Sequence, residues 1–460
     1  MAPAGEAFVE GPTLGPFDSG PLALVADPGE GRPESDSGAS DAESVASRAS
    51  LPGSDSVESL GSLVEAVLAE FPDAEGVDKK RGQVAHATVA TQVAAKQVDP
   101  VVRFSADLEE ACRNLGRLPA AELESGRDAQ MRLWDSLAVH SDRRSCELCH
   151  AAPPTVCSVL RAAGESGVRV GFVEAIIKSV GWPDRELVAH LIGGFPLVGR
   201  IPVVHDARPF AVRQASESIQ SLLRQGPALA QRLVAKQARQ SIRLLDPPGE
   251  DEVWAQTVAE IEKGRMAPLV AVSDQSPFRG APSRRFAVRQ VGASGLTKVR
   301  VIDDLTEALV NLATTVDGKI RMSPIADLVA QIDRLHRAWP GRPLRLVKAD
   351  FSAAYRSCPI DPSHFEFAQV LVARRGTVSR TIQWAMPFGA VAAVYAWDRL
   401  AALFTSVACR ALGVAVNRYV DDLFFVDFAY SAVATRSRLF RVASWFGLAL
   451  ALDKTPEPST

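Results

Sequence analysis

The sequence predicts an α+β protein in which helices pack on one face of an antiparallel sheet, behind a mostly helical region and an acidic N-terminal arm. Three observations indicate this fold class. Strand-like runs alternate with helical runs from residue 256 to residue 460, residues 81–255 carry mainly helical patterns, and residues 1–80 are rich in Gly, Pro, Ser, Asp and Glu. The 460 residues are 47% hydrophobic, which is enough for two or three globular units.

The charge is unevenly spread along the chain. Residues 1–80 hold 16 acidic and 4 basic residues, whereas the remainder holds 38 acidic and 47 basic residues. The arm has too few apolar residues to offset the entropy of ordering, so we expect it to be disordered, with a short amphipathic helix over 59–71. The basic body suits a polyanionic partner, and ordinary solubility charge is the alternative.

Neither a membrane span nor a secretory signal is expected. The longest apolar stretch, residues 386–404, is interrupted by Asp398 and Arg399. Residues 1–30 lack a basic start and a compact apolar core. Six cysteines are too sparse for a disulfide scaffold, which favours an intracellular, reducing location. Whether that is the cytoplasm or the nucleus stays open.

A basic helix is predicted within the helical region. Gly226-Pro227 is expected to start it, and Asp246-Pro-Pro-Gly to end it. Its basic residues are spaced 4, 3 and 4 apart, which places them on one helical face. These residues are Arg232, Lys236, Arg239 and Arg243. Such a face can follow the phosphates of a nucleic acid, and the alternative is a solvated helix surface.

A cysteine-rich stretch, "SCELCHAAPPTVC", leaves three interpretations open. Cys-x-x-Cys-His matches a pattern for covalent haem attachment, which normally requires an exported protein. A zinc site formed by Cys146, Cys149, His150 and Cys157 is chemically feasible, although the usual second paired half is missing. The third interpretation is a set of free thiols. The role of residues 81–255 is not apparent from the sequence.

The order of elements after residue 343 is typical of a split βαβ layout. It reads strand, helical turn, two strands, helix, two strands, helix and strand. The corresponding stretches are 343–350, 351–358, 365–386 around a turn at 374–376, 389–412, 414–428 around a tight turn, 430–446 and 447–452.

Two adjacent aspartates, Asp421 and Asp422, interrupt the apolar run "NRYVDDLFFVD". Like-charged carboxylates in apolar surroundings are costly, so either a tight turn open to water or a metal ion should compensate for them. Asp350 ends a strand 71 residues before Asp421, and the split βαβ layout can bring the three together. Hard oxygen ligands suit two Mg²⁺ ions, with Mn²⁺ as an alternative. Two such ions support nucleotidyl transfer to a 3′-hydroxyl with loss of pyrophosphate.

Five stretches together resemble the reverse transcriptase family. "YVDD" with apolar flanks resembles its catalytic hairpin, and "ADFSAAY" resembles its first catalytic motif. "MPFG" is similar to the positioning motif in the form found in Gypsy-class retrotransposons. "FGLALALDKT" resembles the Gly-Leu…Lys motif, and "KVRVIDDLTEALVN" the fingers segment. The resemblance covers about 285–455 and implies polymerase fingers and a palm with a split βαβ antiparallel sheet.

The resemblance implies a role for the carboxylates and for the residues around them. Asp350, Asp421 and Asp422 would carry the metal ions, together with the backbone carbonyl of Phe351. Lys454 would protonate pyrophosphate as a general acid, and its alternative is a surface lysine.

The resemblance also implies a nucleotide site. Tyr355 would be the steric gate that favours deoxynucleotides, with a core aromatic as the alternative. Lys298 and Arg300 would hold the triphosphate, although Lys298 could simply be exposed. Phe388 and Gly389 would position template and nucleotide. Many retroviral relatives have Gln where this chain has Phe388.

The expected function is therefore RNA-directed DNA polymerisation on an RNA or DNA template-primer with deoxynucleoside triphosphates. The chain stops at Thr460, so the resemblance implies a C-terminally truncated enzyme without the thumb. An inactive nucleic-acid-binding remnant is the alternative. An RNA-dependent RNA polymerase is a third reading, against which Tyr355 and Val420 argue. Template, priming mechanism and oligomeric state are not apparent.

Overall fold

A computed structural model describes residues 120–164, 167–202, 213–244, 247–273, 277–291, 297–318, 320 and 322–459. All of them belong to one compact unit, Ser56–Thr460. The predicted acidic arm and the predicted helix over 59–71 lie outside the described residues. The described fold is α+β, with helices and mixed sheets.

The first half of the described chain is mainly helical, as the sequence predicts. Its elements are α4 (Ala120–His140), α5 (Asp142–Ala151), α6 (Pro154–Arg161), α7 (Val170–Ser179), α8 (Leu187–Gly193), β1 (Gly199–Ile201), α9 (Ile219–Leu244) and α10 (Pro247–Glu262). Strand β1 pairs in parallel with β5 (Thr314–Val316), which follows a short 3₁₀ turn, η2 (Val310–Ala313).

A five-stranded sheet has the order β2-β8-β7-β3-β4. Its strands are β2 (Val270–Ala271), β3 (Ser283–Val291), β4 (Thr297–Asp303), β7 (Gln369–Arg374) and β8 (Thr377–Ile382). Strands β7 and β8 are joined by Arg375 and Gly376, both with positive φ, of 50° and 81°. Two such residues form the tight hairpin turn whose twist matches the flanking strands, at the place that the sequence predicts.

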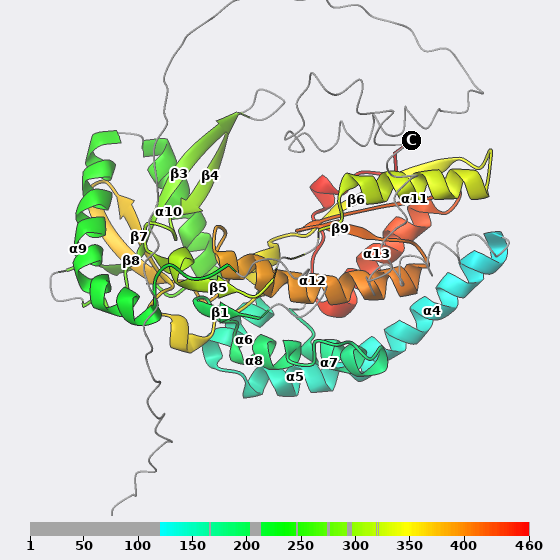
Figure 1. The fold of residues 1–460 in the computed structure, drawn as a ribbon, viewed down its shortest axis with the longest axis horizontal. Helices are drawn as coiled ribbons and strands as arrows, with labels where there is room; N and C mark the ends of the chain where they lie inside the picture. Colours follow the sequence, from blue (N-terminus) through cyan, green and yellow to red (C-terminus); the bar gives the residue numbers. More distant parts are fainter. Residues whose placement is uncertain are drawn as a thin grey trace, which may run out of the picture. The chain divides into compact units, whose positions relative to one another are not determined.

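A three-stranded antiparallel sheet, β6-β10-β9, carries the aspartates. Its strands are β6 (Leu344–Asp350), β9 (Asn417–Tyr419) and β10 (Asp422–Phe428). The other elements of this half are α11 (Ile325–Ala338), α12 (Val391–Leu412), α13 (Ala432–Phe446) and the 3₁₀ turns η3 (Ala354–Ser357), η4 (Pro362–His364) and η5 (Leu452–Lys454). Both α11 and α13 contact β10. Figure 1 shows α9 at one end of the unit and α4 at the other, with the β3–β4 hairpin beside α10.

Helix α12 is the central core helix, and most of its residues are buried. Among the described residues it alone is long and apolar enough to cross a membrane, but 83% of the relevant window is buried inside the protein. The two charges that interrupt it are also buried and paired. Asp398 accepts from Arg418, and Arg399 donates to both carboxylate oxygens of Asp184 at 2.7 and 2.8 Å.

The helical half packs directly against the half that carries the aspartates. The rings of Trp134 in α4 and Trp445 in α13 are stacked with centroids 6.1 Å apart. Arg127 in α4 donates to both carboxylate oxygens of Asp427 in β10, at 3.1 and 3.2 Å, and Thr435 donates to the same carboxylate at 2.6 Å. One contiguous hydrophobic core therefore extends through both halves.

Two details of the predicted elements are wrong. The basic helix does not start at Gly226-Pro227: α9 begins at Ile219 and continues through Pro227. Gly226 allows a close approach instead, since a Cβ there would lie 2.3 Å from the carbonyl oxygen of Arg279. Residues 447–452 do not form a strand. They make a single bridge, between Leu450 and Phe351, and the chain then turns into η5.

The strands after residue 343 belong to two different sheets, which their order along the chain does not reveal. The β7–β8 hairpin leaves the sheet of β6 and pairs in parallel with β3, through Ser283 and Arg284. The edge of β6 that β10 leaves free is bridged by Ser459 at Leu346. The split βαβ order is thus spread over two sheets.

The Asp184–Arg399 ion pair tests how firmly α12 depends on the helical half. Asp184→Ala leaves a buried guanidinium without its carboxylate, so we expect the free energy of unfolding to fall by about 3–5 kcal/mol. The matched control is Glu147→Ala, which removes the exposed partner of Arg143 and should cost less than about 1 kcal/mol. Urea unfolding followed by circular dichroism measures both. Equal losses in the two variants would contradict this account.

Candidate active site

The two adjacent aspartates lie at a tight turn between β9 and β10. Tyr419 ends β9 and Asp422 begins β10, so Val420 and Asp421 form the turn. Val420 has a φ of 56°, which is unusual for a β-branched residue. The turn is held from both sides of its backbone. The N–H of Val420 donates to Met322 Sδ at 3.3 Å, and its carbonyl accepts from Trp397 Nε1 at 3.0 Å.

The register of the sheet brings the third aspartate to the same place. Asp422 is directly opposite Asp350 in the antiparallel β10–β6 ladder. The N–H of Phe351 donates to the carbonyl oxygen of Asp421 at 3.1 Å, which continues the pairing past the end of β6. The Phe351 ring packs in the core against Trp397, so only its backbone is available to a ligand. Three carboxylates from two distant stretches thus lie at one edge of the sheet.

The electrostatics of this edge are unfavourable for anions. Burial and the charge of Asp350 raise the pKa of Asp421 above its ordinary value. Burial also raises the pKa of Asp422, with further contributions from Asp421 and Asp350, while Lys348 acts in the opposite direction. Asp350 itself is only 8% exposed. A bound cation could offset the repulsion among these three carboxylates.

Two lysines supply part of that compensation. Lys454 Nζ donates to Asp350 Oδ1 at 3.0 Å, and Lys348 Nζ is 3.8 Å from Asp422 Oδ1. Partial burial alone would lower the pKa of Lys454, but the hydrogen bond and the charges of Asp350 and Asp421 raise it. Lys454 is therefore a protonated partner of a carboxylate here.

The residues fit a hard divalent cation in ligand type but are not converged for one. Carboxylate oxygens are the protein ligands that Mg²⁺ takes, usually one or two of them together with substrate phosphates. Within the described ranges, however, no three His, Cys, Asp or Glu side chains lie close enough to hold an ion as they stand. Because Lys454 occupies an oxygen of Asp350, a cation shared by Asp350 and Asp422 would have to displace this lysine.

An aromatic pair lies beside the carboxylates. The ring centroids of Tyr355 and Phe388 are 5.1 Å apart in an edge-to-face arrangement. Phe388 is 51% exposed, whereas Tyr355 is partly buried. Burial and the charge of Asp421 raise the pKa of Tyr355 to about 12, so its hydroxyl stays protonated. The pair forms an apolar surface next to the acidic edge.

The "MPFG" segment is tied to the "KVRVIDDLTEALVN" segment by one residue. Asn311 Nδ2 donates to the Gly389 carbonyl at 2.9 Å, and Asn311 Oδ1 accepts from the N–H of Val391 at 2.9 Å. Gly389 has a φ of 90°, a conformation that disfavours a side chain. Asn311 was not among the predicted site residues, although its place at the end of the quoted segment could have indicated it.

Lys298 and Arg300 lie on the exposed face of β4. In the β3–β4 ladder Arg300 is opposite Val288 and Lys298 is opposite Gln290, so the four share one face. Both cations are exposed, and neither has an ion-pair partner within the part of the chain that the structure describes. They are placed to attract an anion, but they lie on a different sheet from the aspartates.

A buried network beneath this surface joins the five-stranded sheet to η3, the turn that follows β6. Arg356, in η3, donates to Gln383 at 2.7 Å and to the carbonyl of Ala385 at 3.0 Å, just before "MPFG". Gln383 Nε2 donates to Asp303 of β4 at 3.2 Å, and Asp303 accepts from Arg285 at 2.7 and 2.8 Å. No sequence pattern indicates this network, because isolated arginines and glutamines are usually exposed.

The other predicted site residues lie elsewhere. Arg232, Lys236 and Arg239 are exposed on α9, where Lys236 is paired with Glu307. The side chain of Arg243 lies outside the described residues. The cysteines of the "SCELCHAAPPTVC" stretch are in α5 and α6, and they are not part of the acidic edge.

Comparisons with known proteins find distant similarity to solved structures. No protein-family model matches the chain, and no curated protein matches it. A crystal structure of the protease-reverse transcriptase of prototype foamy virus, a selenomethionine-labelled CSH mutant, is similar with a TM-score of 0.35 and 14% identity. The similarity covers 46% of this chain and 25% of that chain. A similarity this low carries no argument about the site, whose chemistry follows from its own geometry.

The strained turn gives a first prediction for this site. Val420→Gly should raise the free energy of unfolding by about 1 kcal/mol, because strain of order 1–3 kcal/mol is relieved and partly offset by the entropy of glycine. Val433→Gly, at an exposed position of α13, is the control and should lower it. Chemical denaturation measures both. If Val420→Gly lost as much stability as the control, the turn at Val420 would not be strained.

The raised pKa of Asp421 predicts a pH-dependent stability. A carboxyl group with a raised pKa in the folded state costs stability once it ionises, and that cost is absent when it is protonated in both states. Asp421→Asn should therefore be more stable than the wild type at pH 7, by less than about 1 kcal/mol because the group is partly exposed. The difference should vanish below the unfolded pKa of about 3.9. Thermal unfolding across this pH range tests it, and a wild type that is more stable at pH 7 would contradict it.

Proposed function

We propose that this protein is a template-directed nucleotidyl transferase of the reverse transcriptase type, an RNA-directed DNA polymerase from a retroelement with Gypsy-like motifs. The observation that carries the proposal is the cross-strand pair of Asp350 and Asp422, with Asp421 in the adjacent turn. Carboxylates whose pKa values are raised by burial and by like charge are typical of functional sites, and a bound cation would offset their repulsion. The proposal assigns β6, β9 and β10 to a palm and the β3–β4 hairpin to fingers.

The carboxylates would hold two Mg²⁺ ions, with the Phe351 carbonyl as a further ligand. When bound, these ions would activate the primer 3′-hydroxyl and neutralise charge on the leaving pyrophosphate. Lys454 lies next to this position and is protonated, so it can give a proton to the leaving group once the carboxylates have a different counter-charge.

The nucleotide would lie between the acidic edge and the aromatic pair. Tyr355 is beside Asp421, so its ring can exclude a 2′-hydroxyl under the sugar. Phe388 and Gly389 form the neighbouring backbone and ring surface. Lys298 and Arg300 would bind the triphosphate if the β3–β4 hairpin moves toward the palm, since their cations stabilise negative charge on the transferring group.

A second candidate function is nucleic-acid binding without catalysis. Two observations favour it. Lys454 donates a hydrogen bond to a carboxylate oxygen of Asp350, and the described carboxylates do not lie close enough together to hold a metal ion. The exposed cations on α9 could follow a phosphate backbone in either case. This candidate predicts salt-sensitive binding of primer–template with no extension of the primer.

Primer extension separates the two candidates. The full chain is incubated with a primed RNA template, dNTPs and Mg²⁺, and extension is measured on a gel. We expect extension in the wild type and a loss of roughly 100-fold or more in Asp422→Asn, because a carboxylate that holds the ions is removed. Asp333→Asn, on the surface of α11, is the matched control and should extend normally.

The outcomes are distinct. Extension that survives in the double variant Asp421→Asn with Asp422→Asn would contradict the two-metal assignment. Salt-sensitive binding without extension in the wild type would leave the second candidate. Replacing dNTPs with NTPs tests the sugar preference, and faster incorporation of NTPs would indicate an RNA polymerase instead.

A further inference from the structure

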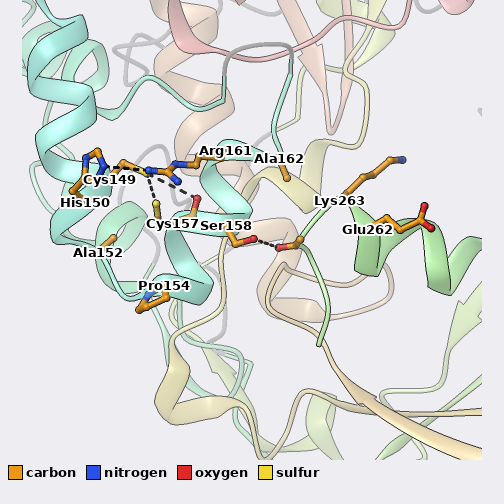
Figure 2. A pocket seen from close by; sticks show the side chains of 11 residues that line it. Cys149, His150, Ala152, Pro154, Cys157, Ser158, Arg161, Ala162, Glu262 and Lys263 are labelled. Carbon is orange, nitrogen blue, oxygen red and sulfur yellow. Dashed lines mark hydrogen bonds between the residues drawn. The ribbon is translucent and has the colours of Figure 1, made fainter. Parts of the chain in front are cut away.

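A cavity lies in the helical half, away from the carboxylates. Its volume is ≈ 520 Å³, and it is bounded by α5 and α6 on one side and by the end of α10 on the other. Figure 2 shows Cys149, His150, Cys157 and Arg161 on the α5–α6 side and Glu262 and Lys263 on the α10 side. The proposed polymerase function uses none of these residues.

Two cysteine thiols meet at the wall of this cavity. The Sγ atoms of Cys149 and Cys157 are 2.7 Å apart, whereas the Cys149 thiol and the Cys157 carbonyl oxygen are 3.9 Å apart. A disulfide bond is about 2.05 Å long, so bond formation requires a movement of well under 1 Å. Cys149 is partly exposed and Cys157 is 9% exposed, which leaves the pair open on the cavity side.

The residues between the two cysteines hold the two thiol groups next to each other. Helix α5 ends at Ala151, and Ala152 and Pro153 are extended, with ψ angles of 154° and 143°. Pro154 then starts α6, a position where proline costs no hydrogen bond. Prolines restrict both their own φ and the preceding residue, so the turn is rigid. Reactive groups held by a rigid turn have a high effective concentration.

Burial keeps the Cys149 thiol protonated at neutral pH. Burial and the hydrogen bond with Cys157 raise the pKa of Cys149 to about 11, while Arg161 acts in the opposite direction. Two thiols form a disulfide only when an oxidant accepts their two electrons and two protons, so the pair needs such a partner.

A zinc site fits this geometry less well. His150 Nδ1 is 2.7 Å from the Cys146 carbonyl oxygen, which makes it a donor there, and its Nε2 faces Arg161 at 3.4 Å. A cation would have to displace that guanidinium. Cys146 is exposed, and within the described ranges no three potential ligands converge.

We propose that Cys149 and Cys157 form a redox-active dithiol site that a low-molecular-weight disulfide, such as glutathione disulfide, oxidises to an intramolecular disulfide. One cysteine loses its proton to solvent, and its thiolate attacks the small disulfide from the cavity, which forms a mixed disulfide and releases one thiol. The second cysteine loses its proton and attacks the protein sulfur of the mixed disulfide, which releases the second thiol. The protein loses two hydrogen atoms, and one disulfide is reduced to two thiols.

Oxidation would affect α6, which forms part of the wall of the cavity. Ser158 Oγ donates to the Gly264 carbonyl at 2.8 Å, and the Ala162 carbonyl accepts from Arg265 at 2.8 Å. A disulfide would fix α5 to α6 beside these contacts and would close the short loop that contains Pro153 and Pro154. The oxidised protein should thus unfold at a higher temperature than the reduced protein.

The test uses the reduced full chain and glutathione disulfide as the probe. After incubation, free thiols are alkylated and the peptides are mapped by mass spectrometry. We expect one cross-link between the Cys149 and Cys157 peptides, a mass lower by two hydrogen atoms, and full reversal by dithiothreitol. The mapping is done on the wild type, so it does not depend on the folding of any variant.

Variants then assign the chemistry. Cys149→Ser and Cys157→Ser should each lose the cross-link, and the cysteine that remains should retain glutathione as a mixed disulfide. Cys146→Ser is the matched control from the exposed face of α5 and should cross-link as the wild type does. A cross-link to Cys146, a lasting mixed disulfide in the wild type, or no reaction would each overturn the proposal.

Discussion

The antiparallel register between β6 and β10 is the constraint on which the candidate site depends. It places Asp422 opposite Asp350, and it leaves Asp421 at the turn, hydrogen-bonded through its carbonyl to the residue after Asp350. A slip by one residue would turn one aspartate to the opposite face of the sheet. The apolar side chains of β10 are buried, which fixes the register. The cost of bringing like charges together is therefore met by hydrophobic packing elsewhere, with Lys348 and Lys454 as partial counter-charges.

The helical half supports that packing. It contacts β10 through the Arg127–Asp427 ion pair and α12 through the Asp184–Arg399 ion pair, both buried and each with two hydrogen bonds. Buried pairs of this kind add little net stability compared with apolar packing, but they tolerate only one arrangement. We therefore regard residues 120–193 as part of the structure that holds α12 and β10 in place, rather than as an independent module.

The sequence was informative where local patterns decide the structure. The β7–β8 turn, helix α12 and the aspartate turn follow from glycine positions, apolar periodicity and adjacent charges. It was uninformative where partners are distant in the chain. Periodicity could not show that β7 pairs with β3, nor that residues 447–452 make one bridge, because both depend on which edge is already occupied. Asn311 and Arg356 were missed for the same reason: their importance lies in the carbonyl groups that they reach.

We propose that Asp350, Asp421 and Asp422 together bind divalent cations. The most direct test of this proposal is Mn²⁺ binding measured by electron paramagnetic resonance, with the full chain, a primer that lacks its 3′-hydroxyl, a template and a matching dNTP. The account predicts saturable Mn²⁺ binding in the wild type, which is lost in Asp350→Asn and retained in Asp333→Asn. Equal Mn²⁺ binding by the wild type and by Asp350→Asn would contradict it.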